Sequence, residues 1–254
     1  RWKTQINFAT NKNKIVSLGG TPNFQYASGN VSMPYKMMVV EGGSLGDIYG
    51  NVFVRDANGK ILLEPAIDKD GNPNAKAGLP QVTTDKAAKI GNFNPDWTLG
   101  WSNTVTYKGF SLYFLIDARV GGDVISLTQA GLDYAGVSKA TGDARDAGYY
   151  MLEKFYQMVG DRGNGTTEFY RYDGTNIRLR EVSLGYSFPQ QMLEKTGFIK
   201  GIDLSLVARN LFFIYKDAPF DPDATMSVGN DNQGLDTFGM PSTRNIGFNI
   251  KFTF

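Results

Sequence analysis

Apolar and polar residues alternate along most of the chain, and this pattern constrains the fold more than any other feature. In the final stretch, NIGFNIKFTF, the apolar positions are Ile246, Phe248, Ile250, Phe252 and Phe254. A period of two is typical of a β-strand with one apolar and one polar face. The chain therefore needs something other than water to cover a long series of apolar strand faces.

The same alternation recurs throughout the sequence. The stretches DWTLGWSNTVTY and GFSLYFLIDARV both alternate, and only Lys108 and Gly109 lie between them. A two-residue link that contains glycine is typical of a tight hairpin. The pattern predicts nine strands, at 2–10, 14–19, 35–41, 46–55, 97–107, 109–120, 176–188, 202–214 and 243–254.

The predicted connections alternate between short and long. Short ones lie near 11–13, 42–45, 108–109 and 189–201, and long ones span 20–34, 56–96, 121–175 and 215–242. Soluble domains rarely contain structureless loops longer than about 12 to 15 residues, whereas outer-membrane barrels combine short turns at one end with long loops at the other. We therefore expect an all-β fold, namely about eight to ten strands of an antiparallel transmembrane β-barrel with a polar lumen.

In this interpretation, lipid covers Phe248, Ile250, Phe252 and Phe254. The alternative is a soluble or surface-attached β-sandwich that binds carbohydrate, with its apolar strand faces buried against a second sheet. Nine meandering strands would leave the first and last strands parallel, whereas bacterial single-chain barrels are even-numbered. The chain begins with Arg1, inside an alternating segment, and we expect it to be a piece of a longer protein.

Composition excludes several functional classes. The chain has no His and no Cys, which removes imidazole-dependent triads, thiol chemistry and the usual zinc sites. The net charge of +1 gives no electrostatic footprint for nucleic acid. The acidic stretches DKDGN (68–72) and Asp217 to Asp236 lack the spacing of a calcium loop and indicate turns, although Asp217, Asp221 and Asp223 could supply oxygen ligands to calcium. We therefore expect no enzyme activity, no cofactor and no metal.

The long connection at 121–175 contains the best candidates for binding a solute. Aromatic faces next to polar groups suit sugars and peptides, although the same rings would also serve as the core of a folded loop. Within this connection, residues 152–160 are predicted to form a short helix. The candidate tyrosines are Tyr149, Tyr150, Tyr156, Tyr170 and Tyr172.

Charged residues on the predicted strands add a second group of candidates. Asp117, Arg119 and Arg209 fall on polar faces and should line the lumen, either to contact the solute or as a solvated wall in which Asp117 and Asp203 balance the arginines. Arg178 and Arg180 share the parity of the apolar positions that follow them, which would turn them toward lipid. A β-bulge, or a position near the membrane interface, would reconcile the two arginines with a membrane strand.

The stretch from Lys89 to Ser126, which includes GNFNPDW, resembles the C-terminal barrel region of the SusC/RagA family of TonB-dependent outer-membrane transporters of Bacteroidetes. Further similar pieces follow in the family's order. They are NKNKIVSLGG (11–20), GSLGDIYGNVF (43–53), NIRLREVSLGYSFPQQMLEK (176–195), LSLVARNLFFIYK (204–216) and the terminal Phe254.

This resemblance implies a role in nutrient import. It implies that residues 1–254 are the C-terminal part of a 22-stranded barrel, whose earlier strands and N-terminal plug lie outside this chain. It also implies a bacterial outer-membrane location, oligosaccharide or oligopeptide cargo, energy from TonB through the missing part, and a SusD-like surface lipoprotein as partner. The terminal aromatic residue of such barrels is part of an assembly signal, so we expect deletion of Phe254 to impair assembly.

Overall fold

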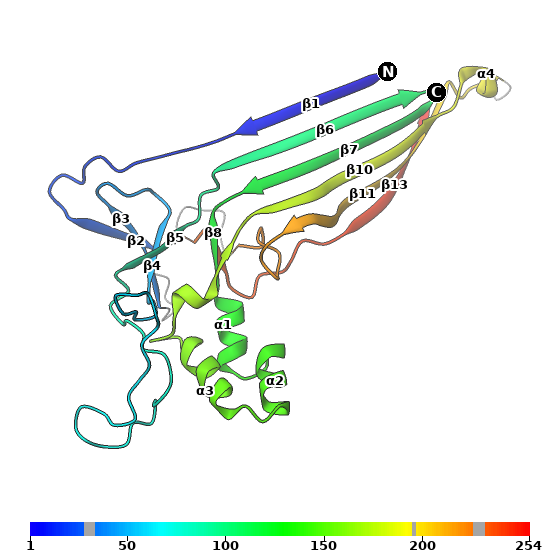
Figure 1. Cartoon of the computed structure of the whole chain (residues 1–254). Coiled ribbons are helices and arrows are strands. Elements are labelled where there is room, and N and C mark those ends of the chain that lie inside the picture. The colour runs from blue at the N-terminus through cyan, green and yellow to red at the C-terminus, as the bar shows by residue number, and fades with distance from the viewer. Residues whose placement is uncertain (28–33, 195–196, 226–231) are drawn as a thin grey trace.

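The computed structural model describes residues 1–27, 34–194, 197–225 and 232–254. It consists of a long sheet, called the wall here, and a mixed body at one end of that sheet, called the cap (Figure 1). Both chain termini lie at the end of the wall that is far from the cap (Figure 1). No helix among the described residues is long and apolar enough to cross a membrane.

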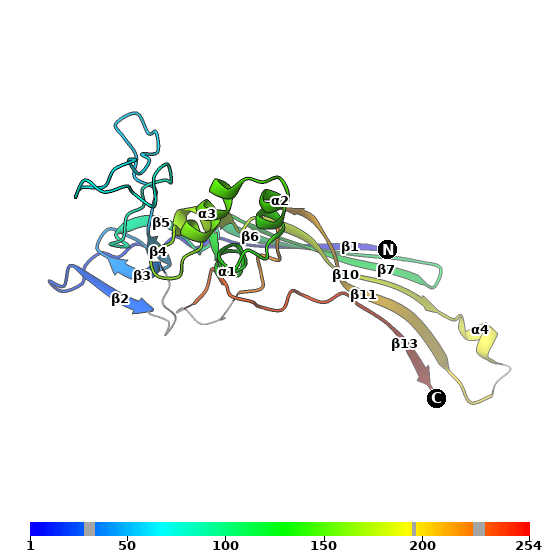
Figure 2. The same ribbon diagram turned by 90° about the horizontal axis from the view of Figure 1, so that it is seen from below.

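The wall is a sheet of six strands in the described residues, and every neighbouring pair is antiparallel. Viewed from below, the far ends of these strands follow a curve from the first to the last (Figure 2), as a barrel wall requires. In spatial order the strands are β1 (Trp2–Ala9), β6 (Trp97–Tyr107), β7 (Phe110–Val120), β10 (Asn176–Ser187), β11 (Gly201–Lys216) and β13 (Asn245–Thr253).

The register of the wall aligns apolar residues across all its strands. Directly opposed residues lie on the same face of a sheet, so the pairing can be followed from strand to strand. One row runs through Trp2, Val105, Leu112, Leu184, Leu206 and Phe248. A second row runs through Tyr107, Phe110, Tyr186, Leu204 and Ile250. We call this surface the apolar face.

The apolar face is exposed: Phe248 is 76% accessible, and Ile250 and Phe252 are each 50% accessible. The described residues therefore provide no second sheet to cover it, which counts against the sandwich alternative. A face of this size needs an apolar solvent, as expected for a barrel wall. At the far end, the ring of Phe254 stacks on that of Phe198, with centroids 6.2 Å apart.

The strand count differs from the sequence-based expectation. Residues 14–19 form no strand, while the predicted strands 35–41 and 46–55 become β3 (Tyr35–Val40) and β4 (Asp47–Gly50) of the cap. Tyr35, Met37 and Ile48 are buried in the cap core, so protein covers them, although their alternation is the same as in the wall. The wall thus has six of the nine predicted strands within the described residues, and its edge strands β1 and β13 do not pair with each other there.

Long and short connections lie at opposite ends of the wall. Lys108 and Gly109 link β6 to β7 at the far end with positive φ angles of 45° and 86°, as a two-residue hairpin turn requires. The other far-end connection, 188–200, contains α4 (Gln190–Leu193). Residues 10–96, 121–175 and 217–244 all connect strands at the cap end. The short connection predicted near 11–13 is wrong, because no strand follows it. The one predicted near 42–45 is confirmed as a short link, but it joins β3 to β4 inside the first long connection and not two strands of the wall.

Two small sheets and a helical unit form the cap. One sheet has the order β2 (Asn23–Ala27), β3, β4, β5 (Ala88–Asn92), and the other has the order β12 (Leu235–Asp236), β8 (Asp123–Ser126), β9 (Arg171–Asp173). The helices are α1 (Leu127–Tyr134), α2 (Lys139–Asp146), α3 (Tyr150–Val159) and the 3-10 turn η1 (Thr167–Tyr170). Helix α3 confirms the helix predicted at 152–160.

Local sequence signals explain where the first two helices begin. Ser126 and Ser138 are their N-caps, and each hydroxyl accepts a hydrogen bond from a backbone N–H in the first turn.

The cap has a hydrophobic core between its two small sheets. Its side chains that are at most 1% exposed are those of Met37, Ile48, Ile125 and Leu235. Each such side chain contributes about 1.5–3 kcal/mol on burial, so the cap has a protein core that the wall lacks.

Candidate functional site

The polar face of the wall is the surface that a barrel lumen would expose to solutes. One of its rows runs through Gln5, Ser102, Leu115, Glu181, Arg209 and Asn245. Arg209 Nε donates to Glu181 Oε2 at 2.9 Å, and the arginine side chain remains 61% exposed. A hollow beside this pair is lined by Ser183, Ser205 and Asn249, so this surface offers hydroxyl, amide and charged groups together.

Arg209 thus lies on the face predicted for it, but its partner differs from the expectation. Asp203, which was expected to balance the wall arginines, instead accepts a hydrogen bond from Ser187 Oγ at 2.5 Å. Glu181 takes that place because it is directly opposite Arg209 in the register, and directly opposed opposite charges attract most strongly.

A β-bulge decides where Arg178 and Arg180 point. The register of β10 shifts between Leu179 and Glu181 against both of its neighbours. This shift leaves Arg180 as the extra residue and pairs Arg178 with Asp117 on the polar face. Two arginines whose parity predicted a lipid-facing position therefore turn inward, as the bulge explanation requires.

The inward arginines meet three carboxylates, and we call Asp117, Arg178, Arg180, Asp221 and Asp223 the mouth cluster. Arg178 NH2 lies 2.6 Å from Asp221 Oδ1 and 3.4 Å from Asp223 Oδ2. Arg180 forms ion pairs with Asp117 and, at 3.3 Å, with Asp223. Arg178 is only 2% exposed. The cluster joins the cap end of the wall to the connection between β11 and β13.

Electrostatics keep the Asp221 carboxylate charged. Burial alone would raise the pKa of Asp221, but hydrogen bonds from the hydroxyl and backbone N–H of Ser242, from the Asp223 N–H, and the Arg178 charge together hold it below its ordinary value. Hydrogen bonds and a cation favour the ionised form of a carboxyl group. Asp221 is therefore a hydrogen-bond acceptor at neutral pH and not a proton donor.

Arg119 lies at the junction of wall and cap rather than in an open lumen. Its NH2 donates to the backbone oxygen of Phe93 at 2.7 Å. The Asp117 carboxylate forms an ion pair with Arg180. These two predicted lumen residues share a strand, and the Nη2 group of Arg119 and the carboxylate of Asp117 are directed to protein partners. Both therefore have a structural role in addition to any contact with solute.

Three of the predicted tyrosines are part of the cap's packing. Tyr170 is 2% exposed and donates to Asp133 Oδ2 at 3.0 Å, and burial together with that carboxylate raises the pKa of Tyr170. Tyr156 packs edge-on with the ring of Phe155 at 5.5 Å, and Tyr172 does so with Phe220 at 5.2 Å. These three tyrosines therefore pack within a folded connection, which was the alternative to binding a solute.

Tyr149 and Tyr150 differ from the other three tyrosines. They are 64% and 74% exposed and line a hollow with Leu79 and Pro80, between the start of α3 and the arm formed by residues 52–84. Exposed rings beside an apolar hollow are available to a sugar face or an apolar side chain. The structure thus separates the candidates into three tyrosines packed in the cap, two exposed tyrosines, the junction residues Asp117 and Arg119, and Arg209 on the open polar face.

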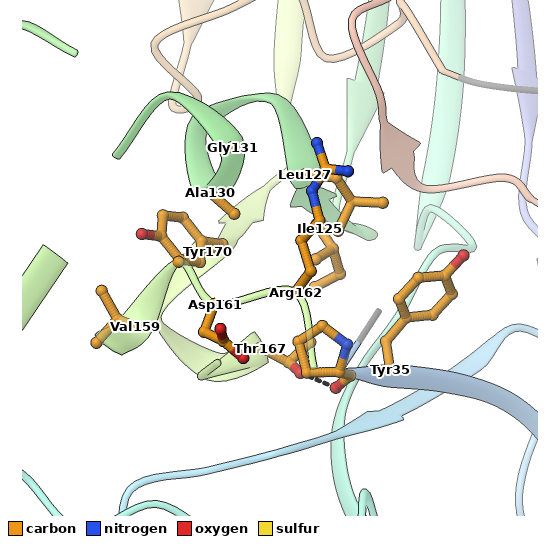
Figure 3. A pocket seen from close by; sticks show the side chains of 12 residues that line it. Tyr35, Ile125, Leu127, Ala130, Gly131, Val159, Asp161, Arg162, Thr167 and Tyr170 are labelled. Carbon is orange, nitrogen blue, oxygen red and sulfur yellow. Dashed lines mark hydrogen bonds between the residues drawn. The ribbon is translucent and has the colours of Figure 1, made fainter. Parts of the chain in front are cut away.

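A small internal pocket near the base of the cap is too small for a nutrient. It lies among Tyr35 of β3, Ile125 of β8, α1 and Tyr170 (Figure 3). Thr167 donates to the backbone oxygen of Pro34 at its edge (Figure 3). Its volume of about 20 Å³ holds about one water molecule. We interpret it as a packing gap.

The acidic stretches form turns in the structure. Asp68 Oδ1 accepts from the backbone N–H groups of Asp70 and Asn72 at 2.9 Å each, which is an Asx turn. Within the described ranges, no group of three or more acidic side chains is arranged to hold a metal ion.

Sequence reasoning missed the role of Asp221 and Ser242 as partners of the inward arginines. The available signal was the wrong parity of Arg178 and Arg180, since an inward-turned arginine needs carboxylates nearby. The sequence did not show which of the carboxylates in the chain would supply them.

Comparison with known proteins agrees with the architecture. No family model matches the chain. It is 29% identical to TonB-dependent receptor P3 of Formosa agariphila, over 99% of this chain and 27% of that receptor. It is 23% identical to TonB-dependent receptor SusC of Bacteroides thetaiotaomicron, over 89% of this chain and 22% of that receptor. The chain thus spans about a quarter of the length of these relatives.

Solved structures show the same fold. The structure of the RagAB peptide transporter aligns with a TM-score of 0.67 at 19% identity, covering the whole of this chain and 27% of that one. The RagAB peptide importer in its open-open state gives a TM-score of 0.61 at 17% identity. By their names, the relatives found by sequence are TonB-dependent receptors, and those found by fold are a peptide transporter and importer. In sequence the chain is thus similar to about a quarter of several TonB-dependent receptors, SusC among them, and in fold it is similar to the matching part of the RagAB peptide transporter.

Proposed function

We propose that the chain forms the C-terminal part of the barrel of a TonB-dependent importer of bulky nutrients, whose plug and other strands lie in the rest of the protein. The observation that carries this proposal is the two-faced wall. Its apolar rows run unbroken across several strands, while its reverse carries the Glu181–Arg209 pair and short polar side chains. A lipid-facing exterior and a polar lumen require this arrangement.

The cap and the polar face have separate roles in this proposal. The cap is on the cell exterior, where Tyr149 and Tyr150 meet the solute first, because these two tyrosines are the most exposed of the five candidates. The polar face then offers exchangeable hydrogen bonds through Arg209, while Asp117 and Arg119 keep the mouth in shape. A SusD-like surface lipoprotein covers the cap, and TonB acts through the part of the protein outside this chain.

Oligosaccharides and oligopeptides both remain cargo classes in this proposal. Tyrosine rings stack on sugar faces and also pack against apolar peptide side chains. The name of the RagAB peptide transporter describes that protein's cargo. For this chain, the apolar lining of the hollow beside Tyr149 and Tyr150 supports oligopeptides with apolar side chains. The polar face of the wall supports oligosaccharides, whose hydroxyl groups need hydrogen-bond partners.

Uptake by intact cells tests the proposal. The full-length receptor would be produced in a strain that lacks it, and uptake of a panel of fluorescent oligosaccharides and oligopeptides would be measured. We expect uptake of at least one cargo class that disappears without TonB, and a several-fold higher half-saturating concentration in Tyr149→Ala/Tyr150→Ala. Tyr134→Ala, which removes a half-exposed tyrosine of α1, is the matched control. Uptake that persists without TonB would contradict the proposal.

A further inference from the structure

We propose that Arg178 is a positioning residue that fastens the cap to the polar face of the wall through Asp221. It would thereby fix where the cap is held over the mouth of the barrel. Only this last consequence rests on the proposed function. The fastening itself rests on contacts among described residues.

On the wall side, Arg178 is rigidly held. The bulge in β10 turns it inward, and its guanidinium lies 4.0 Å from the ring centroid of Phe213 on β11. With 2% of its side chain exposed, it has little freedom to adopt another rotamer. A planar guanidinium with fixed donor directions is suited to hold two partners at once.

On the other side, Asp221 brings together two separated parts of the β11–β13 connection. It accepts from Arg178 NH2 at 2.6 Å, and also from the backbone N–H of Ser242 at 3.0 Å and from the Ser242 hydroxyl. Arg178 NH1 donates to Ser242 Oγ at 2.7 Å. One guanidinium therefore binds residues on both sides of this connection.

The connection then continues directly into the cap. Leu235 and Asp236 form β12, which pairs in parallel with β8. Asp236 Oδ2 accepts from Ser126 Oγ, the N-cap of α1, at 2.6 Å. The Phe238 N–H donates to Thr128 Oγ1 in α1 at 2.6 Å. Contacts thus link β10 to Asp221 and Ser242, and the chain that leads into Ser242 carries the contacts of Asp236 and Phe238 with the start of α1.

The Arg209–Glu181 pair provides an internal comparison. It joins β10 to β11 on the same face, but Arg209 is 61% exposed and its ion pair is with Glu181 of the neighbouring strand rather than with the β11–β13 connection. An exposed ion pair contributes little, whereas removing one partner of a buried pair leaves an uncompensated charge. The two arginines should therefore differ sharply when each is replaced.

The test uses a single introduced thiol in the full-length receptor on intact cells. The chain has no Cys, and Ala218, close to Asp221 in the chain, is 1% exposed, so Ala218→Cys reports whether this part of the connection stays in place. The probe is a membrane-impermeant maleimide, with the receptor lacking the new thiol as background. Labelling rates are compared among the parent, Arg178→Met, Arg178→Lys, Asp221→Asn and Arg209→Met. Outer-membrane level and heat-modifiable mobility check assembly.

We expect Arg178→Met and Asp221→Asn to label about tenfold faster than the parent, since each leaves a buried partner uncompensated. Arg178→Lys should restore part of the protection, and Arg209→Met should stay within about twofold of the parent. If Arg178→Met does not assemble, the decision rests on Asp221→Asn and Arg178→Lys, which preserve side-chain size.

Parent-like labelling of the assembled Asp221→Asn and Arg178 variants would overturn the proposal, as would equal effects of Arg178→Met and Arg209→Met. Labelling needs no uptake, so a receptor that imports nothing would contradict the proposed function and leave the fastening to be judged by its own result.

Discussion

The wall and the cap use the same alternating pattern, but different materials cover their apolar side chains. In the wall, Phe248 and Leu206 are 76% and 54% exposed on the apolar face. In the cap, Met37, Ile48 and Leu235 are all 0% exposed. Alternation therefore shows that a face is covered, and it does not show whether lipid or protein covers it.

Strand length separates the two regions better than periodicity does. Strands of the wall range from eight residues in β1 to 16 in β11, whereas β3 has six and β4 has four. A tilted strand needs about 9–11 residues to cross a bilayer. Short alternating segments inside a long connection therefore favour a protein-covered sheet, and the following predictions test the comparison.

Truncation should have its largest effect in the cap. We expect Ile48→Ala to cost about 2–5 kcal/mol of cap stability, because the cavity in a protein core does not refill. Leu204→Ala on the apolar face should cost much less, since lipid can occupy the space. The denaturant dependence of protease protection of the cap measures the first loss, and that of the heat-modifiable mobility of the barrel measures the second, both in receptor held in lipid. Equal losses would contradict a lipid-covered wall.

Adding charge should reverse that order. We expect Leu206→Lys to destabilise the barrel by about 2–4 kcal/mol if it lies near mid-membrane, because the ammonium would face hydrocarbon. Ser205→Lys, one position away on the polar face, should be tolerated. The amount of heat-modifiable receptor in outer membranes is the measurement. Tolerance of both changes would show that the apolar face does not meet lipid.

A hydroxyl deletion tests the buried part of the cap. Tyr170→Phe should cost about 1–3 kcal/mol, because it leaves the buried Asp133 carboxylate without one of its donors. Tyr150→Phe, at a 74% exposed ring, is the control and should change the protease protection of the cap very little. A cap equally stable in both variants would place Tyr170 outside the cap's polar core.

The smallest effect expected is one of pH on the mouth cluster. The folded pKa of Asp221 is below its ordinary value, so its contribution is present above the unfolded pKa and is lost as pH falls through the folded one. Because maleimide reacts with the thiolate, the labelling rate of Ala218→Cys is divided at each pH by that of the same thiol in denatured receptor. This ratio should stay flat on lowering the pH to about 5 and rise only below about 4, the ordinary range of an Asp carboxyl. The other carboxylates facing the two arginines are Asp117 and Asp223. The rise in labelling that is due to protonation of Asp221 must therefore be absent in Asp221→Asn. A rise above pH 5 would contradict the assignment.

Sequence reasoning predicted the wall well and the cap poorly. The hairpin at Lys108 and Gly109 and the apolar positions of β13 were correct, because both depend on local turn chemistry and a period of two. The predicted strand at 14–19 failed because a six-residue alternation carries too little information. Among the candidate tyrosines, nothing in the local sequence separates buried Tyr170 from exposed Tyr150, because their burial depends on which distant segments meet them.

The sequence by itself determined that the chain forms long two-faced strands whose connections are long at one end only, since side-chain alternation and turn residues act within a few positions. Only the tertiary structure decided that Arg178 turns inward and that Asp221 and Ser242 meet it. That outcome depends on a bulge and on contacts between residues 43 and 64 positions apart. Their energies depend on three-dimensional burial, which the residue order does not express.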